Sequence, residues 1–213
     1  MSSRFLSTVV TKARTLLASS LTIHDQFFHS QINTDVSYDK NTNTSTGAFV
    51  VRDDKGNVVL ACVFKYEPQP TQIPLHVRET IAAHAAVKTL LYFLEREGKG
   101  KLPWSVILET DRDEVPDRVN KDARITDDVK EYYRDIDRMK KRFNSFEARR
   151  MDREGNRVAD YLASTVAHAC PTNGRLYVIG FDNKDYTGFR KLDELIKNDR
   201  DGLPGYDLNY KKD

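Results

Sequence analysis

Three strand-like runs stand near the start of the chain, and helix-like and strand-like segments alternate after them. The runs cover residues 31–38, 46–52 and 58–66, and residues 53–57 contain the Gly and Asn that tight hairpins use. The segments that follow are a helix over 75–97, an apolar strand over 104–110, a helix over 126–143, a strand over 145–151 and a helix over 156–169. This βββαβαβα order predicts an α/β fold, a mixed five-stranded sheet covered by helices.

The two ends of the chain lie outside this pattern. Residues 1–24 are acid-poor, with leucines and valines at helical spacing, which is typical of an organellar presequence and equally of a helix that docks on the domain. The C-terminal part holds a strand at 175–181 and a helix at 189–198. We therefore expect an N-terminal extension over 1–30, a domain over 31–170 and a strand–helix extension over 171–213.

Composition narrows the class of protein. No apolar run reaches the roughly 20 residues of a membrane helix, so no membrane association is expected. Two cysteines do not make a disulfide framework, and reduced thiols in an intracellular protein are the default interpretation. Net charge is only +2, so a nucleic-acid surface requires local clustering. Bases do cluster between residues 138 and 150, as they also would at the end of a solvated helix; the candidates for phosphate contact are Lys140, Lys141, Arg142, Arg149 and Arg150.

Glu79 is the most informative acidic residue. On a helical wheel it lies at the centre of the apolar face that includes Ala82, Ala86 and Leu90. An ionised carboxylate on a core-facing stripe is costly unless it is paired or binds a metal. The alternative is a frayed first turn that reaches solvent.

Three further acids have both a functional and an ordinary interpretation. Asp35 lies within the first strand beside Asn33 and Ser37, where Asp is a poor strand former. Asp111 directly follows the apolar strand, and ligand sites of open α/β sheets lie at the carboxyl ends of strands. Asp160 falls near the start of the last helix, where an acid also simply suits the helix N-terminus.

These acids and their neighbours resemble motifs of the type 1 ribonuclease H family, in its reverse-transcriptase-like branch. The segments are INTDVS at 32–37, GAFVVRDDKGN at 47–57, RETIAA at 78–83, LETD at 108–111 and REGNRVADYLA at 153–163. The last is the most specific, and together they cover about two thirds of the chain. The resemblance implies a ribonuclease H-like fold and metal ligation by Asp35, Glu79, Asp111 and Asp160.

The same resemblance implies a chemistry. Two Mg²⁺ or Mn²⁺ ions, about 4 Å apart, would serve phosphodiester cleavage, with Asn33 and Ser37 near the nucleic acid. The sequence departs from the family pattern in two informative places. Val36 replaces the usual Gly, and the loop before Asp160 lacks the His used by some members, where Glu154 is the candidate for proton transfer.

Two functions follow as expectations. The first is a metal-dependent endonuclease that hydrolyses the RNA strand of RNA–DNA hybrids. The second is a catalytically weak or silent nucleic-acid-binding or scaffold module, meeting a protein partner through the terminal extensions. Either is compatible with mitochondrial or other organellar targeting by residues 1–24, or otherwise with a cytoplasmic or nuclear location.

Overall fold

A computed structural model describes residues 28–66, 73–94, 102–120, 124–170, 176–180, 192 and 194–197. The N-terminal helix predicted within residues 1–24 lies outside these ranges. Within them, no helix is both long and apolar enough to cross a membrane. The elements in chain order are β1 (Phe28–Asp39), β2 (Thr44–Arg52), β3 (Val58–Lys65), α2 (Leu75–Leu94), β4 (Leu102–Thr110), α3 (Glu114–Val119), α4 (Lys130–Lys140), β5 (Phe143–Arg150), η1 (Arg153–Asn156), α5 (Arg157–Tyr161), η2 (Leu162–Val166), α6 (Ala167–Ala169) and β6 (Leu176–Gly180).

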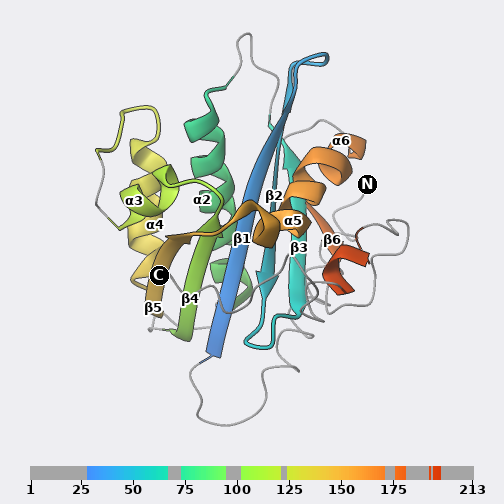
Figure 1. Cartoon of the computed structure of the whole chain (residues 1–213). Helices are drawn as coiled ribbons and strands as arrows, with labels where there is room; N and C mark the ends of the chain where they lie inside the picture. Colours follow the sequence, from blue (N-terminus) through green and yellow to red (C-terminus); the bar gives the residue numbers. More distant parts are fainter. Residues whose placement is uncertain are drawn as a thin grey trace, which may run out of the picture.

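The strands form one mixed sheet in the order β5-β4-β1-β2-β3-β6 (Figure 1). The pairs β1–β2 and β2–β3 are antiparallel, whereas β1–β4 and β4–β5 are parallel. The predicted five-stranded mixed sheet is thus confirmed. The strand predicted at 175–181 adds to it as β6, which pairs antiparallel with β3.

The β2–β3 hairpin closes as its sequence predicts. The Asp53 carboxylate accepts hydrogen bonds from the backbone N–H groups of Lys55 and Asn57. Gly56 takes a positive φ of 78°, which glycine adopts without steric cost. The turn chemistry of residues 53–57 therefore fixes the register of two central strands.

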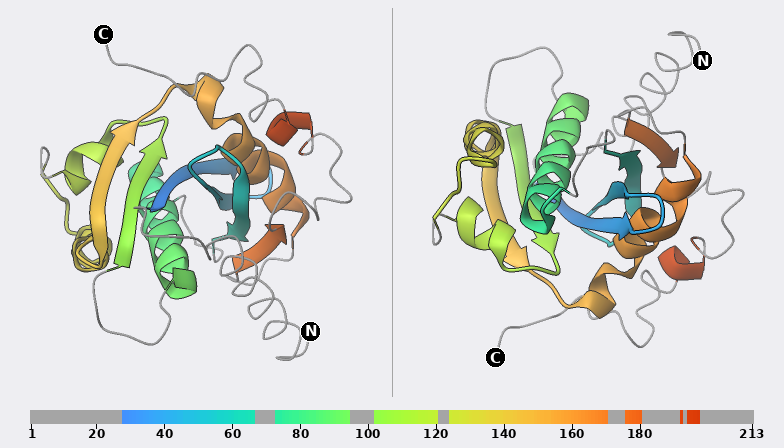
Figure 2. Two further views of the ribbon diagram at one scale, coloured as in Figure 1. Left: turned by 90° about the horizontal axis from the view of Figure 1, so that it is seen from below. Right: turned by 90° about the horizontal axis from the view of Figure 1, so that it is seen from above.

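Helices cover both faces of the sheet (Figure 2). Apolar side chains of α2, α3 and α4 pack with Ile32, Phe49 and Leu108 in one core cluster. The other face carries a second cluster, in which α5 and η2 pack on Ala48, Val50 and Val63. Because successive side chains of a strand point to opposite faces, the same strands supply both cores.

The last core helix is not regular. Residues Leu162–Val166 form a π-helical turn between α5 and α6. The buried Thr46 hydroxyl of β2 donates to the Ala163 carbonyl at 2.8 Å, which satisfies a backbone acceptor within that turn. A contact from the sheet thus accompanies the irregular turn.

Element boundaries agree with the sequence predictions only in part. The segment interrupted by Pro116 contains the short helix α3, because proline is tolerated in a first helical turn. The helix expected from Thr126 begins at Lys130. Of the helix predicted at 189–198, the described residues 192 and 194–197 are helical, and Leu192 and Ile196 are buried in the second cluster.

Candidate metal centre

Two of the predicted acids come from neighbouring parallel strands. In the β1–β4 register Thr34 lies opposite Thr110, so Asp35 and Asp111 follow at the same level. Asp111 stands directly after the end of β4, while β1 continues past it to Asp39. The parallel pairing of β1 and β4 therefore brings these two residues together.

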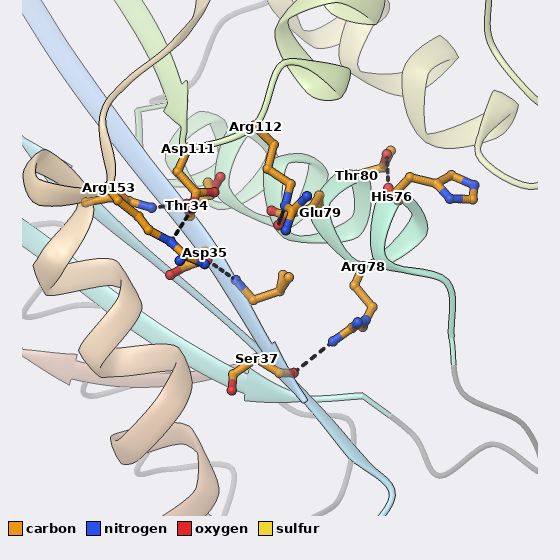
Figure 3. Close-up of polar contacts among 12 residues, drawn as sticks. Thr34, Asp35, Ser37, His76, Arg78, Glu79, Thr80, Asp111, Arg112 and Arg153 are labelled. Atoms are coloured by element: carbon orange, nitrogen blue, oxygen red, sulfur yellow. Dashed lines mark hydrogen bonds and ion pairs between the residues drawn. The ribbon is translucent and has the colours of Figure 1, made fainter. Parts of the chain in front are cut away.

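Glu79 approaches from α2, in the second turn of the helix. Its side chain is only 2% exposed, as its place on the apolar face predicted. One carboxylate oxygen from each of Asp35, Glu79 and Asp111 lies within 4.8 Å of the other two (Figure 3). Three acids distant in sequence thus form one cluster.

The pKa values of Asp35 and Glu79 are both raised in this cluster. Burial raises the pKa of Asp35 to about 8, and the charges of Glu79 and Asp111 add to the effect, although the Val36 N–H opposes it by donating to the carboxylate. The pKa of Glu79 also rises to about 8, because of burial and then the charge of Asp111. Without a bound cation, ionising these buried neighbouring carboxylates is unfavourable.

Two arginines partly offset this charge. Arg112 Nε lies 3.5 Å from Glu79 Oε1, and Arg153 Nε lies 3.3 Å from Asp111 Oδ2. The other oxygens, Glu79 Oε2 and Asp111 Oδ1, are buried and have no hydrogen-bond partner. Unpartnered carboxylate oxygens that converge fit a hard divalent cation such as Mg²⁺ or Mn²⁺.

Asp160, the fourth predicted ligand, is not part of the group within 4.8 Å. It is exposed on α5, and its charge is the weakest of the contributions that raise the pKa of Asp35. It therefore stands near the three acids without joining them.

The residues predicted beside the nucleic acid are placed less favourably. Asn33 is 1% exposed and is held by hydrogen bonds to Glu109 and Arg52, which does not fit direct contact with a nucleic acid. Ser37 is half-buried, and its carbonyl accepts a hydrogen bond from Arg78. Glu154, the predicted proton-transfer residue, is exposed in η1 on the loop that carries Arg153.

The predicted basic stretch is divided between two ends of the sheet. Lys140, Lys141 and Arg142 precede β5, and the Lys140 ammonium already contacts the Val119 carbonyl and Asp137, each at 2.9 Å. Arg149 and Arg150 lie at the carboxyl end of β5, level with Glu109 and Thr110 of β4. Only this second pair is on the side of the acids.

An open hollow of about 630 Å³ lies beside the cluster. Its rim carries three arginines, of which Arg112 and Arg153 had not been singled out from the sequence; both are next to or within the acidic motifs, and that position was the available signal. The lining residues are Asp111, Arg112, Asp113, Glu114, Asp117, Arg150, Met151 and Arg153. Of the three clustered acids, Asp111 lines the hollow.

Comparisons with known proteins show what this fold is similar to. The model of the reverse transcriptase-like family matches residues 101–166, which include Asp111 and Asp160. No curated protein matches the sequence. Among solved structures, the chain is similar to RNase H1 from Halobacterium salinarum NRC-1, with 15% identity, a TM-score of 0.54, and coverage of 67% of this chain and 99% of that one.

Two other structures show the same likeness. The N-terminal RNase H domain of a Mycobacterium tuberculosis protein is 14% identical, with a TM-score of 0.55 and coverage of 67% and 95%. LC11-RNase H1 from compost, solved with an RNA/DNA hybrid, is 20% identical, with a TM-score of 0.52 and coverage of 62% and 92%. The resemblance drawn from the sequence is thus confirmed: the chain has a ribonuclease H-like fold, and its residues 101–166 match the model of the reverse transcriptase-like family.

Proposed function

We propose that this chain is a metal-dependent endonuclease that hydrolyses the RNA strand of RNA–DNA hybrids. The observation that carries the proposal is the convergence of three carboxylates from β1, α2 and the end of β4, with two buried oxygens that have no hydrogen-bond partner. The likeness to RNase H1 structures, one of them in complex with an RNA/DNA hybrid, supports the substrate class.

Asp35, Glu79 and Asp111 would hold the metal, and Asp160 is the fourth candidate ligand. When bound, two Mg²⁺ or Mn²⁺ ions supply the activation of water and the stabilisation of the leaving oxygen. The chain's own contribution is to bring three negative groups together and to keep water from most of their surface. Glu154 is the candidate for proton transfer, because it is exposed on the loop that reaches Asp111 through Arg153.

Arginines around the hollow would bind the substrate. Arg150 lies on its rim, 3.2 Å from Asp113, and its side chain is 55% exposed. Arg153 is 81% exposed. Such groups bind phosphates without reading sequence, so discrimination of RNA from DNA would rest on duplex shape and the 2′-hydroxyls.

A second candidate is a nucleic-acid-binding or scaffold module without activity. The observation in its favour is that Arg112 and Arg153 already pair with two of the acids, while Asp160 stands outside their group. Val36 is a weaker argument for this second candidate. Its side chain packs on the sheet face covered by α2, whereas Asp35 lies on the opposite face with Ala48.

A cleavage assay separates the two candidates. Purified protein is incubated with a hybrid labelled on either strand, in Mg²⁺ and in Mn²⁺. We expect cuts within the RNA strand at many sequences and little cutting of duplex DNA. Asp35→Asn should abolish cleavage while hybrid binding persists, and Val36→Gly should be at least as active as the wild type.

The control is Asp54→Asn, which removes an exposed acid from the β2–β3 turn and should retain full activity. If the wild type and Val36→Gly both bind the hybrid but cut it with neither metal, the scaffold function is correct.

A further inference from the structure

A buried polar network lies two residues before a proposed metal ligand on each of β1 and β4. Asn33 of β1 and Glu109 of β4 are opposite each other in the parallel register. Each precedes a proposed ligand by two residues, Asn33 before Asp35 and Glu109 before Asp111. The Asn33 side-chain amide donates to Glu109 Oε2 at 2.8 Å. This contact therefore joins β1 and β4 just before their pairing ends at Thr34 and Thr110.

Glu109 is the centre of this network. It is 2% exposed, and Oε2 also accepts a hydrogen bond from the Gln31 amide of β1. Its Oε1 accepts from Arg149 of β5, at 2.7 Å from Nε and 2.6 Å from Nη2. Because Arg149 presents two nitrogens to one oxygen, the direction of the Glu109 carboxylate is fixed from the neighbouring strand.

The network also extends across β1 to β2. Asn33 Oδ1 accepts from Nε of Arg52 at 3.0 Å, and Arg52 is 1% exposed. The Asn33 amide further contacts the Met151 sulfur at 3.2 Å, while the Met151 N–H donates to the Thr110 carbonyl. The loop that follows β5 is therefore tied to the last residue of β4, directly before Asp111.

From this arrangement, and resting on the proposed function, we propose that Glu109 is a positioning residue for the metal centre. By binding β1 and β5 through Asn33 and Arg149, it sets the separation of the Asp35 and Asp111 carboxylates. Glu109 touches neither metal nor substrate in this role. Polar groups that orient metal ligands from behind commonly change metal affinity by about 10- to 100-fold when they are replaced.

The proposal assigns Arg149 a different task from the one its charge predicted. A phosphate contact would leave metal affinity unchanged and would make hybrid binding weaker and less dependent on salt when Arg149 is lost. If Arg149 instead positions Glu109, its loss should weaken Mn²⁺ binding and leave hybrid binding unchanged. Arg149 is 42% exposed, so replacing Glu109 leaves no buried cation without a partner at this contact.

The test is a Mn²⁺ titration of the full chain, followed by the electron paramagnetic resonance signal of free Mn²⁺, beside urea unfolding of each variant. In Glu109→Gln we expect the Kd for Mn²⁺ to rise about tenfold or more, at a temperature where the variant is folded. Arg149→Gln, the variant that keeps the buried carboxylate, should raise this Kd by less and leave hybrid affinity in EDTA unchanged.

Thr46→Val is the matched control, since Thr46 is also fully buried and donates a hydrogen bond, but to Ala163. It should lower the midpoint of urea unfolding and leave the Kd for Mn²⁺ unchanged. If Glu109→Gln and Arg149→Gln fold and bind Mn²⁺ like the wild type, the proposal is wrong and the network is structural only. If the wild type binds no Mn²⁺, the metal site itself fails, and the inference fails with it.

Discussion

Replacing Asp35 by Asn should stabilise the metal-free protein at neutral pH, although the same change removes a proposed metal ligand. The folded-state pKa of Asp35 is raised from 3.8 to about 8, because the group is buried beside Glu79 and Asp111. A carboxyl group with a raised pKa contributes stability that is fully present below pH 3.8 and is lost as the pH rises through about 8. Asparagine has no proton to lose in this pH range, so it acquires no buried charge.

The magnitude follows from the size of the pKa change. A tenfold change in an ionisation constant corresponds to about 1.4 kcal/mol, so Asp35 costs the folded protein at most about 4 kcal/mol at pH 7. The new amide keeps an oxygen that can accept the Val36 N–H, but it also places an NH₂ group in the same buried space. We therefore expect a net gain of about 2 kcal/mol, after the cost of that imperfectly satisfied donor.

Urea unfolding in EDTA at pH 5, 7 and 8.5 measures this gain. The free energy of unfolding of the wild type should fall across this range, and the advantage of Asp35→Asn should grow with pH. Asp54→Asn, at an exposed position, controls for a general effect of charge. If Asp35→Asn is no more stable than the wild type at pH 8.5, burial and the neighbouring acids do not raise the pKa of Asp35.

Three further results are expected. Millimolar Mg²⁺ or Mn²⁺ should raise the melting temperature of the wild type through preferential binding to the folded state, and Asp35→Asn combined with Asp111→Asn should abolish that rise in differential scanning fluorimetry. Arg150→Gln should reduce the log–log salt slope of hybrid binding by about one, whereas Lys140→Gln should leave it unchanged, because its ammonium is held by Val119 and Asp137. Gly47→Ala should cost about 1–3 kcal/mol in urea unfolding, since its Cβ would lie 2.4 Å from Phe64 Cζ; an unchanged midpoint would show that the Phe64 ring moves freely.

The elements that carry the acids could be predicted because their signals are local. The period of two in the strands, the apolar face of α2 around Glu79 and the uninterrupted apolar run of β4 each show in a short window of sequence. Parallel pairing of β1 and β4 then follows from the helix between them. These steps predicted the elements, whereas the grouping of Asp35, Glu79 and Asp111 was implied by the family resemblance.

What could not be predicted depends on distant partners. Asn33 looked like a surface residue, and nothing local shows that Glu109 and Arg52 satisfy it in the interior. The pairs Asn33–Glu109 and Arg149–Glu109 join residues 76 and 40 positions apart. The division of the basic stretch likewise depends on the length of β5, which separates Arg142 from Arg149.

The sixth strand has a consequence for any attempt to trim the chain to a minimal domain. A fragment ending at Cys170 would retain all four proposed metal ligands, but it would lose β6, the strand that pairs with β3. The backbone N–H and C=O groups of Val58–Lys65, a largely apolar strand, would then form an open edge, and such edges pair with other chains. We expect the trimmed fragment to aggregate or to exchange strands between copies, so its loss of activity would say nothing about the metal centre.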